Sequence, residues 1–132
     1  MSAATLEDAA FLAAFEAGTL APSAFRHADH VRAAFLLLKR HGFAGALARM
    51  TKTLRVFAAR HGVPERYHET VTVAFLVLVN ERLHEIPEAS WPAFARAHAD
   101  LLDKNALAAH YTPEILSSSR ARAVFVLPVR HA

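Results

Sequence analysis

The sequence of 132 residues contains no cysteine. This absence excludes disulfide bonds, thiolate zinc sites and a cysteine nucleophile, and it is typical of a reducing compartment, although an oxidising one is also compatible. Glycine is scarce as well, with four residues that are not clustered. The sequence therefore has no glycine-rich phosphate loop, and it has no Gly-x-Ser-x-Gly nucleophile elbow.

Long apolar runs are also missing. The longest, Val73 to Val79, is much shorter than the roughly 20 residues that a membrane-spanning helix needs. The residues from Met1 to Asp8 include acids and no basic run, which argues against a secretory signal. We therefore expect a cytoplasmic protein without a membrane partner.

The positive charge is modest and dispersed. The formal net charge is +3, and the basic residues are scattered at spacings typical of solvated helix faces. Nucleic-acid binding would require them to gather on one face, so we expect no nucleic-acid partner. A homo-oligomer remains compatible with the sequence.

What the sequence does contain is helical periodicity from end to end, with apolar residues recurring every three or four positions. The length suits one domain. These features predict an all-α, single-domain helical bundle of about five to seven helices, spanning residues 1–132, with an irregular C-terminal third.

The helix ends are predicted from capping residues and glycines. Thr5 is expected to cap a first helix that ends at Gly18. Further helices are expected over 27–41, ended by Gly42, and over 43–61, ended by Gly62. The next helix is expected to run from Glu65 or Arg66 to about 83. Although residues 70–79 are rich in β-branched side chains, the length without turn signals favours a central helix, apolar on all sides.

The C-terminal third is expected to hold shorter helices. One should begin at Ser90-Trp91-Pro92, with the serine as cap. Another should cover 103–110, and a last one should be capped by Ser118 or Ser119 and run to Phe125.

Polar residues at the starts of the two most buried helices form the candidate site. His27 and His30 are three positions apart and point to one side of a first turn that continues into core positions. His68 and Glu69 precede the apolar run of the central helix. Because buried imidazoles and carboxylates must be paired, hydrogen-bonded or metal-bound, we expect these groups to converge on a shared cavity.

Such a group resembles a nitrogen and oxygen site for a divalent metal ion: zinc, iron, manganese or copper. The first hypothesis is a small metal-dependent enzyme acting on a small molecule, with His27, His30 and His68 as ligands. Glu69 would act as ligand or general base. The His-Glu-x-x-His motif of hydrolases is absent, because Thr72 stands four positions after His68.

A second polar cluster lies in the C-terminal third. Tyr111 is expected to cover the mouth of the pocket and to donate a hydrogen bond to the substrate. Arg122 is expected to bind a substrate carboxylate or phosphate, and Tyr67 and Thr72 are further substrate-contacting candidates.

Other readings of the same residues remain open. The second hypothesis is a metal-free module that binds a small acidic or apolar molecule in a mostly hydrophobic cavity, with His27, His68 and Arg122 as hydrogen-bonding groups. A metal-free enzyme is intermediate, with His27 or His30 paired across helices to Glu69. In the purely structural alternative, these histidines cap helices or complete hydrogen-bond networks.

Several segments together resemble a known group of proteins. They are Phe25-Arg26-His27-Ala28-Asp29-His30, Tyr67-His68-Glu69-Thr70, Tyr111-Thr112-Pro113-Glu114 and Ser119-Arg120-Ala121-Arg122. From Phe25 onward the chain is similar to a family of small helical bacterial proteins to which no activity is attached. The histidine pair also resembles the metal-dependent DinB-like helical proteins, but the third histidine of that pattern has no equivalent here.

Overall fold

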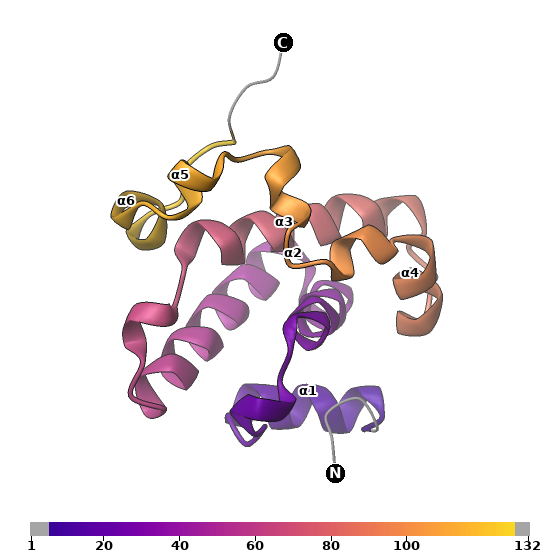
Figure 1. The fold of residues 1–132 in the computed structure, drawn as a ribbon. Coiled ribbons are helices and arrows are strands. Elements are labelled where there is room, and N and C mark those ends of the chain that lie inside the picture. The colour runs from indigo at the N-terminus through magenta and orange to yellow at the C-terminus, as the bar shows by residue number, and fades with distance from the viewer. Residues whose placement is uncertain (1–5, 129–132) are drawn as a thin grey trace.

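Helices joined by short turns make up most of the described part of the chain (Figure 1). The structure, a computed structural model, describes residues 6–128. Within them the α-helices are α1 (Asp8–Ala17), α2 (His27–Arg60), α3 (Glu69–Glu85), α4 (Trp91–Ala97), α5 (Pro113–Leu116) and α6 (Ser119–Ala123). The 3₁₀ turns are η2 (Pro22–Ala24), η3 (Pro64–Arg66), η4 (Ala99–Leu102) and η5 (Ala106–Ala109). These residues contain no strand, so the predicted all-α fold is confirmed.

The first helix, α1, is bounded by a carboxylate and a glycine. Glu7 caps it, because its carboxylate accepts the amide hydrogen of Ala10 at 2.9 Å. The predicted cap, Thr5, lies outside the described residues. Gly18 ends the helix as predicted, with the left-handed angles φ 73° and ψ 24°.

Helix α2 contains both helices that the sequence predicts over 27–41 and 43–61. They meet at Gly42, whose angles are φ 73° and ψ −178°. Side chains other than that of glycine rarely tolerate this backbone conformation. Figure 1 shows α2 as two segments that meet at an angle. The predicted break is therefore present as a kink.

The core is centred on the first half of α2. Val31, Ala34, Phe35 and Leu38 recur there at helical spacing, and all four are buried. Helix α1 packs on one side of α2, α3 packs on another, and α6 packs on α3 (Figure 1). Because the first half of α2 forms the core and α3 packs against it, the N-terminal ends of α2 and α3 lie near the interior.

A helix over the β-branched segment is confirmed, but two details of the prediction are wrong. Helix α3 begins at Glu69, because Pro64 forms a 3₁₀ turn and His68 supplies the N-cap. It is also not covered on all sides, since Val77 is 41% exposed. Within residues 6–128, no helix combines the length and apolar character that crossing a bilayer requires.

The C-terminal third is irregular, as predicted, and Ser90 and Ser118 cap α4 and α6. The prediction of a helix over 103–110 is wrong. Asp103 accepts the amide hydrogen of Asn105 at 2.8 Å, and the following residues form only η5. Such local side-chain hydrogen bonds compete with helix formation.

The last predicted helix ends at Ala123 rather than at Phe125, because α3 holds the following segment in an extended form. The Thr70 hydroxyl is fully buried, donates to the Val124 carbonyl at 2.9 Å and accepts the Val126 amide hydrogen at 3.0 Å. Tyr111 donates its hydroxyl hydrogen to the Val126 carbonyl at 2.7 Å.

Candidate functional site

Two adjoining cavities lie between α2 and α3, beside the turns that precede these helices. The outer cavity measures about 550 Å³ and the inner cavity about 260 Å³. Four residues line both and mark where the cavities meet: His30, Leu54, Val71 and Thr72. The inner cavity is otherwise almost entirely apolar, whereas the outer one also carries Tyr67 and His68.

His27 begins α2 and lines the inner cavity. Its Nε2 atom lies 3.0 Å from the Leu101 carbonyl oxygen, and its ring packs edge-on against Phe75 at 4.6 Å between centroids. These contacts attach the first turn of α2 to η4 and α3. One nitrogen of His27 is therefore engaged in structure.

His30 lies one turn further along α2 and lines both cavities. Its ring stacks on Phe25, with 4.1 Å between centroids. Its ring nitrogens have no hydrogen-bond partner within residues 6–128. Every side-chain nitrogen or oxygen atom that is itself buried in these residues does have a partner, so the His30 nitrogens are not among the buried atoms. The ring nitrogens must therefore reach water-accessible space, which the two cavities provide.

The environment of His30 also sets its charge. Burial, and secondarily the neighbouring His27, lower the pKa of His30 from 6.5 to about 4. At neutral pH its imidazole is uncharged, so one ring nitrogen is able to donate a hydrogen bond and the other is able to accept one.

His68 lines the outer cavity, but both of its ring nitrogens are used by the fold. Nδ1 accepts the Val71 amide hydrogen at 3.2 Å, which caps α3. Nε2 donates to the Leu116 carbonyl oxygen at 2.7 Å. A metal ion could bind His68 only by replacing one of these hydrogen bonds.

Tyr67, at the outer cavity, belongs to a polar network with Glu69 and Arg55. Its hydroxyl donates a short hydrogen bond to Glu69 Oε1, and Arg55 donates to the same oxygen at 3.1 Å. The Arg55 guanidinium also lies over the Tyr67 ring, 4.9 Å from its centroid. Burial, followed by the hydrogen bond to Glu69, raises the pKa of Tyr67 to about 12. Glu69 itself is not among the residues that line either cavity.

Tyr111 and Arg122 line neither cavity. Tyr111 is buried against Ala74, Phe75 and Leu107, and its hydroxyl binds the Val126 carbonyl oxygen. Arg122 donates to the Glu65 carbonyl oxygen at 2.8 Å. The structure thus brings together five of the predicted site residues around the cavities (His27, His30, Tyr67, His68 and Thr72) and leaves Glu69, Tyr111 and Arg122 outside their linings.

Residues 6–128 contain no group of three or more histidine, cysteine, aspartate or glutamate side chains placed to hold a metal ion. Comparisons with family models, with curated proteins and with solved structures gave no match. The family resemblance of the sequence therefore stays a prediction.

Sequence reasoning missed several residues of the outer cavity. His61 lines it and packs edge-on against Phe57, with 4.5 Å between ring centroids. Arg66 also lines it and is exposed, and its guanidinium has no partner within residues 6–128. The sequence does carry a signal, since Leu54, Phe57 and His61 recur at helical spacing, but residue 61 is predicted only as the end of a helix.

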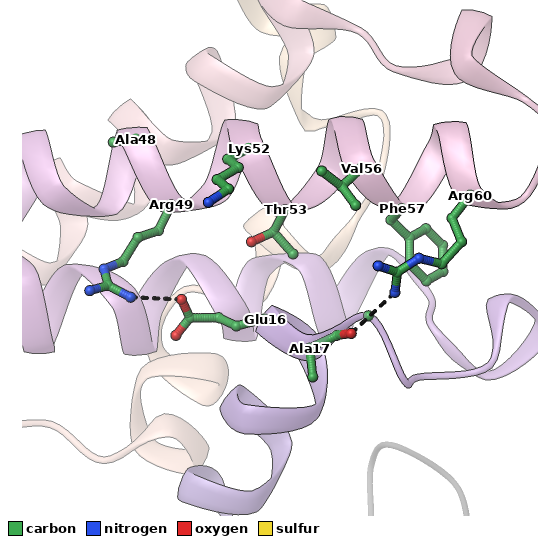
Figure 2. Close-up of a pocket in the computed structure, with 10 residues that line it drawn as sticks. Glu16, Ala17, Ala48, Arg49, Lys52, Thr53, Val56, Phe57 and Arg60 are labelled. Atoms are coloured by element: carbon green, nitrogen blue, oxygen red, sulfur yellow. Dashed lines mark hydrogen bonds and ion pairs between the residues drawn. The ribbon is translucent and has the colours of Figure 1, made fainter.

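A separate groove of about 520 Å³ lies between α1 and the second half of α2. Figure 2 shows Arg49 directed at Glu16, to which it donates at 2.8 Å, and Arg60 directed at the Ala17 carbonyl oxygen, at 3.2 Å. These two cations hold the C-terminal end of α1 against α2. The groove contains none of the predicted site residues.

Proposed function

We propose that this protein binds a small, mainly apolar molecule in the outer and inner cavities without a metal ion. The observation that carries this proposal is the position of His30, which lines both cavities and whose ring nitrogens have no hydrogen-bond partner within residues 6–128. Ligand sites of small molecules are concave and mostly apolar, with a few placed polar groups. His30 is such a group.

The remaining lining supports the same function. Leu54, Val71 and Phe75 supply apolar surface, and Thr72 adds a hydroxyl where the cavities meet. A volume of a few hundred Å³ suits a small organic molecule. Burying the apolar part of a ligand here would provide most of the affinity, and the hydrogen bond to His30 would orient it.

The metal-dependent enzyme of the first hypothesis fits this geometry less well. Two of its three proposed ligands, His27 and His68, already use ring nitrogens in hydrogen bonds to main-chain atoms. Its proposed base, Glu69, is bound by Tyr67 and Arg55. Metal binding would require breaking contacts that hold α2, α3 and the C-terminal segment together.

The test is titration of the ¹⁵N-labelled protein with 1-naphthol, an apolar molecule with one hydroxyl. We expect amide shifts of cavity residues such as Val71 and Thr72, unchanged by a chelator. His30→Phe preserves a ring of similar size without hydrogen-bonding nitrogens, and should weaken binding by about 2- to 10-fold. His84→Phe, at an exposed position, is the matched control and should bind as the wild type does.

Two results would contradict this proposal. One is the absence of any shift at the cavity residues, with shifts elsewhere or none. The other is binding that a chelator abolishes and added zinc restores, together with metal in protein purified without a histidine tag. That second outcome would support the metal-dependent hypothesis.

A further inference from the structure

Arg66 is the one residue among the lysines, arginines, aspartates and glutamates of the described chain that lines the outer cavity. No aspartate or glutamate is among the described residues that line either cavity. Arg66 is the arginine of the outer lining, and neither lysine nor arginine lines the inner cavity. A ligand with a negative group therefore meets a cation and no lining carboxylate.

Arg66 lies where it would contact a group at one end of a bound ligand, not a group in the middle of it. Arg66 is the last residue of η3. Its backbone N–H donates to the Val63 carbonyl oxygen at 2.9 Å, and this hydrogen bond holds the backbone of Arg66 in the turn. Its side chain is exposed and unpartnered within residues 6–128. It lines only the outer cavity, whereas Val31, Ala34 and Met50 line only the inner one.

The cavities thus change in character along their length. Arg66 lies in the outer part, the neutral His30 lies at the junction, and the inner part is apolar. A planar guanidinium matches a carboxylate with two parallel hydrogen bonds. Multiply charged phosphate groups are usually met by several cations, and this lining offers one arginine.

We infer that the ligand is an amphipathic carboxylic acid, whose carboxylate binds Arg66 and whose apolar body extends past His30 into the inner cavity. This inference rests on the proposed binding function and names the ligand class. The polar nitrogens of His30 allow a hydroxyl or carbonyl along the ligand body. An amine at the end of the same body would be repelled by Arg66.

The experiment compares three probes with one alkyl chain: octanoate, 1-octanol and octylamine. Affinities are measured by calorimetry, and the site is identified from amide shifts of the labelled protein. We expect octanoate to bind about tenfold more tightly than 1-octanol, as one charge-assisted pair in a partly exposed site allows, and octylamine to bind most weakly.

Variants at Arg66 test the assignment of the carboxylate. Arg66→Glu should weaken octanoate binding about tenfold or more and weaken 1-octanol binding much less, whereas Arg66→Lys should retain part of the preference. Arg96→Glu makes the same change in net charge at an exposed position of α4, and should leave the octanoate affinity within about twofold. Circular dichroism of each variant shows whether the fold is intact.

The outcomes separate the two proposals. Equal affinities for octanoate and 1-octanol, or equal effects of Arg66→Glu and Arg96→Glu, would overturn the carboxylate inference while cavity binding stands. If neither octanoate nor 1-octanol shifts the cavity amides, the binding function itself fails.

Discussion

Acidification should destabilise the native protein through His30, because burial disfavours its charged form. The imidazole titrates at 6.5 ordinarily and at about 4 in the fold. The unfolded chain therefore binds a proton at a higher pH than the native chain does. The free energy of unfolding is therefore unaffected by this group above pH 6.5, and it decreases as the pH falls from 6.5 towards 4. Between about pH 7.5 and about pH 5, the loss from this one group is about 2 kcal/mol.

Urea unfolding at several pH values measures this loss if the contributions of the other titrating groups are subtracted. His30→Phe serves as the reference, because it retains His27, His61, Tyr67 and His68 around the cavities and their contributions cancel in the difference. We expect the difference in unfolding free energy between wild type and His30→Phe to shift by about 2 kcal/mol against the wild type over this pH range. His84→Phe, at an exposed position, is the control for removing one imidazole from the unfolded chain. Parallel curves for wild type and His30→Phe would refute the reasoning.

Four substitutions test other parts of the structure. Thr70→Val removes the hydroxyl that holds residues 124–126, and should cost about 1–3 kcal/mol in urea unfolding; a negligible loss would show that these hydrogen bonds contribute little. Gly42→Ala introduces a side chain at a positive φ, so a lowered melting temperature and a loss of about 1–3 kcal/mol are expected, whereas an unchanged melting temperature would argue against the kink. His68→Asn retains a capping side chain and should be about 1 kcal/mol more stable than His68→Ala; equal stabilities would contradict the capping role. Glu69→Gln should lower the pKa of Tyr67 from about 12, though not to its ordinary value because burial is the larger cause; ultraviolet titration with Tyr67→Phe as reference would detect an unmoved pKa, which would count against this hydrogen bond.

Local signals in the sequence predicted most of the helical architecture. Gly18 and Gly42 mark positions where the backbone needs a positive φ, and Ser90 and Ser118 mark caps, so these boundaries follow from single residues. Boundaries that depend on distant contacts were missed. The end of α6 depends on Thr70, more than fifty positions earlier in the chain, which draws Val124 and Val126 into an extended segment.

The candidate site shows the same division between local and distant information. Helical spacing placed His27 and His30 on one side of α2, and both line the inner cavity. No local pattern indicated that Leu101 and Leu116 would supply carbonyl oxygens to His27 and His68. Nor did it indicate that the turn after Gly62 would bring Arg66 to the outer cavity, because that placement depends on how α2 and α3 pack.

The glycine at the bend of α2 decides whether this chain can stay compact. A straight helix of 34 residues would be about 51 Å long. A folded domain of 132 residues has a radius of gyration of about 14 Å, which corresponds to a diameter of about 36 Å. An unbent α2 would project beyond such a body, with Met50 and Ala58 stripped of their neighbours. The kink at Gly42 thus divides one long helix into two shorter helical segments. The outer cavity lies between the second of these segments and α3, and its position depends on the kink.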